Sequence, residues 1–279
     1  MSAAIRQGSE TLAGRVAFHE LGGFDLEEVG VESLERLWLR GGFPRSYLAR
    51  SEPRSEEWRQ NFIRTFVERD LPRLVGTGGL SEMGRLWAML AHLHGTVLNA
   101  SELGRSFGAS HTTIRKYLDR LVGTFVVNEL RPWSENAGKR LVRSPKVYIA
   151  DSGLLHALLG VVEARDLLRH PKLGASWEGF MVAQVIRRLR ARREECSFWA
   201  THAGAELGLL VASGRTRLGF EVKRTDTPRV TPSMRSAMES LHLDNLTVIH
   251  AGQRSFPLAA DIRALAACDL LALDPLRLD

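Results

Sequence analysis

Cysteine is nearly absent from this 279-residue sequence: Cys196 and Cys268 are the two present, far apart and without a CxxC spacing. This scarcity argues against a disulfide framework and against structural zinc, and it favours a reducing, cytoplasmic location. The histidines show no HxxxH or HExxH spacing, so the sequence offers no histidine metal site either.

Long apolar runs are also missing. No window approaches eighteen uninterrupted apolar residues, so we expect no membrane-spanning helix. The first residues, "MSAAIRQGSETLAGR", are polar and lack the apolar centre of a signal peptide. The sequence contains no internal repeat and no low-complexity segment. We therefore expect a cytoplasmic protein with no membrane partner.

Basic residues outnumber acidic ones, 38 to 32, which gives a formal net charge of +6. Such a balance favours polyanionic partners, because cations fixed near phosphates release condensed counterions. A second interpretation is compositional: a high-GC bacterial genome replaces lysine by arginine throughout. The charge alone does not choose between the two.

Three regions follow one another along the chain. Residues 1–79 show apolar residues at helical spacing, with Leu34, Leu37 and Trp38 in one stripe. Residues 80–146 combine helices with a hairpin, and residues 147–279 alternate helices with strands. The predicted fold class is α/β (α+β, multi-domain): a helical lid-like segment, a winged helix-turn-helix and a mixed-sheet α/β domain.

The second region carries the clearest local signal, "NASELGRSFGASHTTIRKYL". Asn99 is placed to cap a helix over Ala100–Phe107, Gly108 permits a tight turn, and Ser110 is placed to cap a second helix. Two helices joined by such a short turn are typical of a helix-turn-helix. The strand "FVVNEL", the polar turn "SENAGKR" and the strand "LVRSPKVYIAD" would add a wing.

The second helix of this motif ordinarily enters the DNA major groove with its N-terminal residues. We therefore predict DNA contacts from that helix and from the wing, through His111, Thr112, Arg115, Lys116, Lys139, Arg140 and Arg143. Winged helices also serve as protein-docking modules, so this alternative stays open. The sequence does not decide between DNA and RNA and gives no base preference.

In the third region, "AELGLLVASGRTRLGFEVKRT" predicts two strands joined at Ser213-Gly214. Glu221 and Lys223 lie two residues apart and share one face of the second strand. The further elements expected are a helix over "SWEGFMVAQVIRRLRARR", a strand over "CSFWAT", a helix over "PSMRSAMESLH", a strand over "NLTVIHAG" and a helix near "AADIRALAA".

Glu178 lies in a predicted helix, Glu206 in the first predicted strand of the hairpin, and Glu221-x-Lys223 at the end of the second. This order of residues resembles the PD-(D/E)xK nuclease fold. The resemblance implies that Glu178, Glu206 and Glu221 hold Mg²⁺ or Mn²⁺, and that Lys223 helps position or deprotonate the nucleophile. Structural alternatives exist: Glu178 would pair with Arg187 or another arginine, and Glu221 with Lys223 as an ion pair. Asp151 is expected to be a helix N-cap.

The resemblance extends over most of the chain. "LRGGFPRSYLA", "FVERDLP", "LNASELGRSFGASHTTIRKYL", "PKVYIADSGLL", "LGASWEGF", "GAELGLLV" and "FEVKR" follow in order. Together they resemble the prokaryotic ATPases that carry a DUF4143 domain behind an AAA-type module. That resemblance implies a winged helix plus a PD-(D/E)xK-like domain in the C-terminal part.

Two departures from the family pattern bear on activity. The sequence has no GxxxxGK(S/T) phosphate-binding loop, so we expect no ATP site in this chain and read it as a truncated or split form. The family pattern there is G-A-E-apolar-D. This sequence has Gly208 at the position of the aspartate, so an expected metal ligand is missing. No cofactor is therefore assigned with certainty, although Mg²⁺ or Mn²⁺ fits the site's residue types.

These observations favour nucleic-acid binding, with duplex DNA as the expected partner, and an inactive nuclease-like domain. Two alternatives stay open: a Mg²⁺-dependent DNA endonuclease using Glu178, Glu206, Glu221 and Lys223, and a protein-docking or homo-oligomerisation module. Arg187, Arg188, Arg190, Arg192 and Arg193 are expected to form a solvated helix face, or a DNA track if that face adjoins the winged helix.

Overall fold

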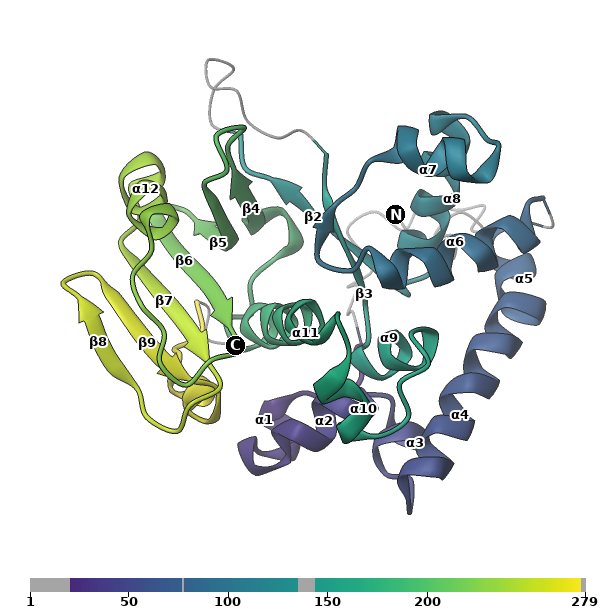
Figure 1. The fold of residues 1–279 in the computed structure, drawn as a ribbon, viewed down its shortest axis with the longest axis horizontal. Helices are drawn as coiled ribbons and strands as arrows, with labels where there is room; N and C mark the ends of the chain where they lie inside the picture. Colours follow the sequence, from purple (N-terminus) through teal and green to yellow (C-terminus); the bar gives the residue numbers. More distant parts are fainter. Residues whose placement is uncertain (1–20, 77, 135–143, 277–279) are drawn as a thin grey trace, which may run out of the picture.

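The computed structural model describes residues 21–76, 78–134 and 144–276, which fold around one sheet. Its strands are β1 (Thr96–Val97), β2 (Val127–Pro132), β3 (Lys146–Ile149), β4 (Cys196–Ala200), β5 (Glu206–Ser213), β6 (Thr216–Lys223), β7 (Asn245–His250), β8 (Phe256–Ala259) and β9 (Ile262–Ala266). The order across the sheet is β1-β3-β2-β4-β5-β6-β7-β9-β8 (Figure 1). The predicted mixed α/β class is confirmed.

Helices precede, interrupt and cover this sheet. They are α1 (Leu26–Val29), α2 (Leu34–Arg40), α3 (Pro44–Tyr47), α4 (Glu52–Thr65), α5 (Leu71–Val75), α6 (Leu80–His92), α7 (Ala100–Phe107), α8 (His111–Gly123), α9 (Ser152–Leu158), α10 (Ala164–Arg169), α11 (Leu173–Arg188) and α12 (Pro232–Leu241). Short 3₁₀ turns lie at Val31–Ser33, Arg193–Glu195 and Ala267–Ala272. None of the described helices is long and apolar enough to cross a bilayer.

Helices α4 and α5 form one rod that passes through a π-helical segment at Phe66–Asp70. Pro72 follows this segment in the first turn of α5. A proline lacks the backbone N–H and its ring clashes with the carbonyl four residues earlier, so an unbroken α-helix is disfavoured here. The wider π turn relieves that conflict. Pro72 is thus accompanied by a local change of helix type, and the rod ends at Gly76.

Helices α7 and α8 have the boundaries that the sequence predicts. Asn99 Oδ1 accepts a hydrogen bond from Glu102 N at 3.1 Å, and Ser110 Oγ accepts one from Thr113 N at 3.1 Å. Gly108 between them has φ 62°, a left-handed conformation that favours glycine. Both predicted caps and the short turn are confirmed.

The inner face of α8 is formed by Ile114, Leu118 and Leu121, all fully buried. They share one apolar cluster with Trp87 of α6 and Val127 of β2, the two elements against which α8 packs. Strands β1 and β2 each pair antiparallel with β3, so α6, α7 and α8 rest on a three-stranded sheet. Ile114, Leu118 and Leu121 recur at the helical spacing i, i+4 and i+7, which gives α8 its single apolar face.

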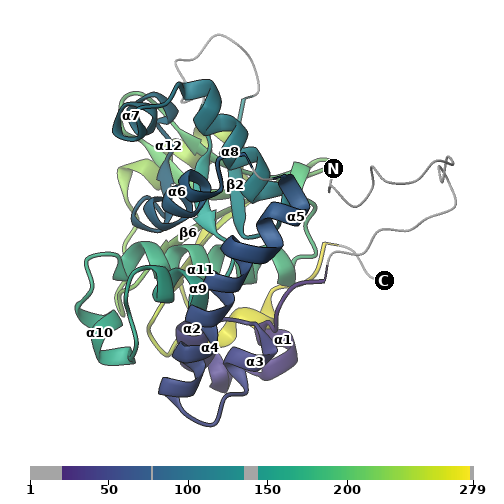
Figure 2. The same cartoon turned by 90° about the vertical axis from the view of Figure 1, so that its right-hand side faces the viewer.

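The C-terminal strands continue the same sheet. Strand β2 pairs parallel with β4 through two residues, Arg131 with Ser197 and Pro132 with Phe198. Strands β4, β5 and β6 are antiparallel neighbours, while β6, β7 and β9 run parallel. Helix α11 packs against one side of these strands and α12 against the other, in two separate apolar clusters (Figures 1 and 2).

The predicted helix near residues 259–267 is wrong. This stretch forms the turn between β8 and β9 and then β9 itself, which pairs parallel with β7. Alanine-rich sequence favours a helix locally, but Ile262, Ala264 and Ala266 are buried at alternate positions of the strand. Pairing with a buried neighbour outweighs the intrinsic preference of alanine, as strand formation depends strongly on context.

The N-terminal helices share a core with the C-terminal region. Trp38 of α2 stacks edge-on against Trp177 of α11, with ring centroids 4.9 Å apart, and its Nε1 donates to Ser176 Oγ at 3.0 Å. The same cluster includes Leu130 of β2. The largest apolar core therefore spans residues on both sides of the predicted boundaries at 79 and 146.

Candidate functional site

The carboxylates predicted for the nuclease-like site are brought together by three elements. Helix α11 supplies Glu178, β5 begins with Glu206, and β6 ends with Glu221 and Lys223. Strands β5 and β6 form the predicted hairpin, with Ser213 paired to Thr216 and a turn at Gly214-Arg215. The hairpin places the start of β5 beside the end of β6, which is why Glu206 and Glu221 are neighbours.

Gly208 marks the middle of this group. Its N–H donates to Glu221 Oε2 at 3.1 Å. A Cβ on Gly208 would lie 3.6 Å from Glu221 Oε2 and 4.0 Å from Glu178 Oε1, so a side chain here would point among the carboxylates without a backbone clash. The position that the family pattern fills with an acid is thus the centre of the constellation.

Gly208 also lies in a β-bulge. Between two paired positions, Gly208 and Leu209 of β5 oppose the single residue Phe198 of β4. Glycine within a strand commonly marks such a bulge, and bulges re-aim the neighbouring side chains. The bulge lies two residues from Glu206, whose carboxylate pairs with Lys146 at the start of β3.

A lysine that the sequence analysis did not single out occupies the site. Lys146 Nζ lies 3.3 Å from Glu178 Oε1 and forms a close ion pair with Glu206 Oε1. Its side chain is 5% exposed, and its ammonium lies 5.5 Å from the Phe198 ring centroid. Glu178 therefore pairs with Lys146, not with Arg187 or the other arginines considered from the sequence.

Tyr148, two residues further along β3, completes the network. Its hydroxyl donates to Glu178 Oε1 at 3.1 Å. Residues i and i+2 of a strand share one face, so "KVY" in "PKVYIAD" carries Lys146 and Tyr148 together toward α11. The sequence signal for this pair was a lysine two residues before a tyrosine in an otherwise apolar strand.

The charges of the network shift its pKa values. Burial lowers the pKa of Lys146, but Glu178 and Glu206 outweigh burial and hold the pKa above its ordinary value of 10.5. Burial and the adjacent Glu178 carboxylate raise the pKa of Tyr148 well above 10. Lysine is therefore charged and tyrosine neutral at physiological pH, which suits them as donors to carboxylates.

Glu221 and Lys223 form the second ion pair, with Lys223 Nζ 2.7 Å from Glu221 Oε1. Lys223 is half exposed, whereas Glu221 is 16% exposed. Burial lowers the pKa of Lys223, but Glu221 more than compensates, so the pKa lies above 10.5. The ion-pair alternative considered from the sequence is present in the structure.

These contacts do not fit a bound Mg²⁺ or Mn²⁺. The single Lys146 ammonium already pairs with two of the three carboxylates, and Gly208 offers no side-chain oxygen. Within residues 21–76, 78–134 and 144–276, no three Asp, Glu, His or Cys side chains are grouped to hold a metal ion. Glu178, Glu206, Glu221 and Lys223 lie near one another, with Glu178 and Glu206 paired to Lys146 and Glu221 paired to Lys223.

The predicted DNA-contacting residues of α8 lie on its outer face. His111, Thr112 and Lys116 are exposed. Arg115 is 40% exposed and pairs with Glu129 of β2, with Nη1 3.3 Å from Oε1. The predicted wing residues Lys139, Arg140 and Arg143 lie outside the described residues.

Two buried histidines have structural partners. His156 Nδ1 donates to Leu39 O at 2.9 Å, and Nε2 lies 2.7 Å from Ser176 Oγ, which donates to it in the neutral tautomer. His94 Nδ1 accepts from Ile149 N at 3.0 Å. Burial lowers the pKa of His94 to about 3 and that of His156 to about 4, so both are neutral.

Asp151 is the N-cap of α9, as predicted. Its Oδ1 accepts from Leu154 N at 2.9 Å, and Oδ2 accepts from Gly42 N at 2.7 Å. Burial raises its pKa from 3.8, against the opposing effect of these backbone donors. The carboxyl group thus joins α9 to the turn after α2.

The expectation of a solvated arginine face on α11 is wrong for Arg187 and Arg188. Arg187 Nη1 donates to Gly23 O at 2.8 Å, and Arg188 donates to Leu273 O at 2.7 Å and Leu271 O at 2.8 Å. These guanidinium groups hold the segments before α1 and after β9 against α11. Arginine suits this role because its planar guanidinium carries five N–H donors, which can bind several backbone carbonyls at once.

Comparison with known proteins finds two domains of unknown function: residues 31–165 match DUF8612 and residues 173–270 match DUF4143. Uncharacterized proteins of Mycobacterium bovis and Mycobacterium tuberculosis are each 46% identical over 263 residues. The matched region is 94% of this chain and 59% of each relative, so the chain spans somewhat more than half their length. No solved structure matches the chain.

Proposed function

We propose that this chain, whose residues 173–270 match DUF4143, is the nucleic-acid-binding module of a DUF4143-type ATPase and carries an inactive nuclease-like site. Duplex DNA is the expected ligand. The ATPase association rests on the sequence resemblance, while DNA binding rests on the geometry of α7 and α8.

The observation that carries DNA binding is the exposed N-terminal half of α8. A helix-turn-helix reads the major groove with these residues, and here they are His111, Thr112 and Lys116. The buried side of α8 packs against α6 and β2, so the outer face is available to a ligand. Figure 1 places α7 and α8 on the side of the molecule away from β8. Three helices on a small antiparallel sheet support the winged-helix interpretation.

The inactive nuclease-like site follows from Gly208 and Lys146. Gly208 supplies no carboxylate at the centre of the group, and the Lys146 ammonium already pairs with both Glu178 and Glu206. Phosphodiester hydrolysis of this type depends on a divalent cation that activates water and stabilises developing charge. We therefore expect binding without cleavage.

DNA binding is tested by fluorescence anisotropy with a labelled duplex across a series of salt concentrations. Binding should weaken as salt rises, with a slope of about −0.9 per phosphate contacted. Lys116→Ala should weaken all sequences alike and reduce the slope by about 1. Arg254→Ala, an exposed arginine between β7 and β8, is the matched control and should change neither quantity.

Two results would favour the alternatives. Salt-independent or absent DNA binding would make a protein-docking or oligomerisation role the better account of α8. Cleavage of the duplex in Mg²⁺ that stops in EDTA and in Glu221→Ala would identify an endonuclease, because Glu221 lies in the carboxylate group and not on α8.

A further inference from the structure

A hollow of about 540 Å³ lies on the surface beside α3 and the first turns of α4, within the range of about 300–1,000 Å³ found for ligand pockets. It is lined by Arg45, Leu48, Ala49, Arg50, Arg54, Glu57, Trp58 and Asn61. Figures 1 and 2 both place α3 at the bottom of the molecule and α7 at the top, so the hollow lies apart from the face proposed to bind DNA.

The lining is basic, with three arginines against one carboxylate. Arg54 is 3.8 Å from Glu57, and both side chains are mostly exposed, so this pair neutralises little of the charge. Arg45 and Arg50 are exposed as well. The hollow therefore presents guanidinium groups suited to bidentate contacts with carboxylates.

Apolar groups accompany these charges. Leu48 is 61% exposed, among the most exposed large apolar side chains of the described residues. Trp58 is half-buried and packs against Phe43 and Phe62, with ring centroids 5.5 and 5.3 Å away, so its indole is held in place. Leu48 and Trp58 together offer an apolar contact within a basic surface.

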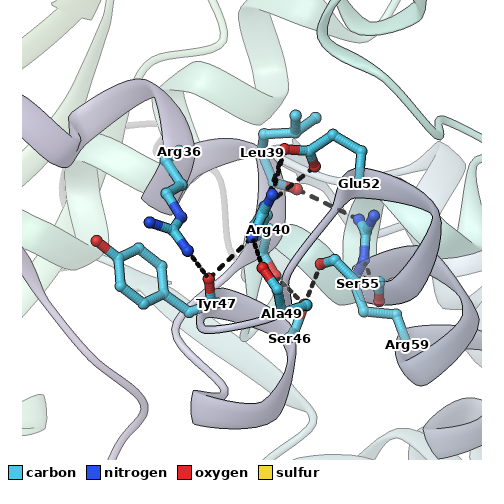
Figure 3. Close-up of polar contacts among 9 residues, drawn as sticks. All are labelled: Arg36, Leu39, Arg40, Ser46, Tyr47, Ala49, Glu52, Ser55 and Arg59. Atoms are coloured by element: carbon cyan, nitrogen blue, oxygen red, sulfur yellow. Dashed lines mark hydrogen bonds and ion pairs between the residues drawn. The ribbon is translucent and has the colours of Figure 1, made fainter.

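Leu48 lies between Tyr47 and Ala49, whose carbonyl groups accept hydrogen bonds from arginine side chains (Figure 3). Buried Arg40 donates to Tyr47 O at 3.1 Å and Ala49 O at 2.6 Å, and its guanidinium pairs with the Glu52 carboxylate at 2.6 Å. Arg36 donates to Tyr47 O at 2.8 Å.

The start of α4 is anchored in the same way. Ser46 Oγ donates to Arg40 O at 2.6 Å and lies 2.9 Å from Ser55 Oγ. Fully buried Arg59 donates to Leu39 O and Gly153 O at 3.3 and 3.1 Å. A surface connection held by this many contacts is preorganised, and preorganisation lowers the entropic cost of binding a ligand.

We infer that this hollow is a docking site for an acidic peptide segment with an apolar side chain. The segment's carboxylates pair with Arg45, Arg50 and Arg54, and its apolar side chain rests on Leu48 and Trp58. Charge complementarity selects an acidic ligand. Leu48 is the most exposed apolar group of the hollow, ahead of half-buried Trp58, and it favours a peptide over a nucleic acid because a leucine offers a base neither a stacking face nor a hydrogen bond.

The test uses the full chain and fluorescein-labelled synthetic peptides that contain aspartate and glutamate around one leucine, phenylalanine or tryptophan. One arm replaces the apolar residue of each peptide by alanine, and another replaces the peptide by a labelled single-stranded oligonucleotide. Fluorescence polarisation gives Kd for each probe.

Arg50→Glu and Arg54→Glu should each weaken binding of the acidic–apolar peptides by about fivefold or more, since each replaces an attraction with a repulsion. Leu48→Ser should also weaken them and should not affect the alanine-substituted peptides. Arg254→Glu makes the same charge change elsewhere on the surface and should stay within about twofold of the parent. Lys116→Glu on α8 should leave peptide binding unchanged.

Three outcomes would overturn the inference. The first is the absence of saturable binding by every peptide at millimolar concentration. The second is an equal loss in Arg254→Glu, which would identify general charge attraction. The third is a preference for the oligonucleotide that Arg50→Glu abolishes and Leu48→Ser leaves intact, which would identify a nucleic-acid site. None of these depends on whether α8 binds DNA.

Discussion

The ammonium group of Lys146 on β3 contacts the carboxylate of Glu206 on β5, although β2 and β4 lie between these strands in the sheet. The same ammonium reaches Glu178 of α11. Strands β2 and β4 pair through two residues at their ends, so the hydrogen-bonded link between the two parts of the sheet is short. Lys146 thus adds an ionic link between the part of the sheet under α6 and α8 and the C-terminal part.

Replacing Lys146 by methionine is expected to destabilise the protein by about 2 kcal/mol. Removing one partner of a fully buried pair costs about 3–5 kcal/mol, and the 27% and 49% exposure of Glu178 and Glu206 reduces that cost. Urea denaturation at neutral pH measures the change. The control is Lys223→Met, whose half-exposed pair should cost no more than about 1 kcal/mol. Equal effects of the two variants would contradict the role given to Lys146.

Stability should fall as the solution is acidified below pH 6.5. The pKa of His94 is lowered to about 3 and that of His156 to about 4, so the unfolded chain takes up protons that the folded protein does not. Each histidine then removes about 1.4 kcal/mol per pH unit between 6.5 and its folded pKa. Asp151 acts in the opposite direction, because its raised pKa adds stability as pH falls through that pKa.

Thermal unfolding at a series of pH values from 7 to 5 measures this loss. His156→Gln should make the pH dependence shallower while lowering stability at pH 7, because the hydrogen bonds to Leu39 and Ser176 are altered. An equal pH dependence of the melting temperature in His156→Gln and in the parent protein would contradict a neutral His156 in the folded protein.

Gly208→Asp is expected to lower stability without metal and to create a response to Mn²⁺. The new carboxylate meets no backbone clash but joins Glu178 and Glu221, so it adds like charge that a cation relieves. A ligand that binds the folded state alone raises stability by RT ln(1 + [L]/Kd), so Mn²⁺ should raise the melting temperature of this variant.

Gly208→Asn supplies the control for that experiment, because it has nearly the same size and no charge. It should show little response to Mn²⁺, and the parent protein should show none. A clear Mn²⁺-dependent rise in the melting temperature of the parent protein would mean that the metal displaces the Lys146 ammonium from the carboxylates.

Glu129→Gln should strengthen duplex DNA binding, by up to about tenfold at low salt. Glu129 pairs with Arg115 of α8, and removing its charge leaves Arg115 available to a phosphate. The salt slope should steepen by about 1. Glu239→Gln on α12 makes the same change on an exposed residue of another element and should have little effect. Weaker binding by Glu129→Gln would indicate that the ion pair positions α8 for DNA.

The elements that the sequence predicted correctly are those with local causes. Asn99, Gly108 and Ser110 define α7 and α8 because a cap or a left-handed turn depends on a few adjacent residues. The β5–β6 hairpin also follows from alternating apolar residues around a short turn. Strand β9 was missed because its alanines favour a helix until β7 is present as a pairing partner.

The sequence by itself determined the order of Glu178, Glu206, Gly208 and Glu221, because their places along one helix and two strands form a linear pattern. The tertiary structure alone decided which cation they meet. Lys146 is 32 residues from Glu178 and reaches it because β3 joins the sheet beside α11, and Arg187 is turned to the carbonyls of Gly23 and Phe24 instead. Electrostatic pairing depends on distance in space, and no local rule places a buried ammonium among carboxylates so distant in sequence.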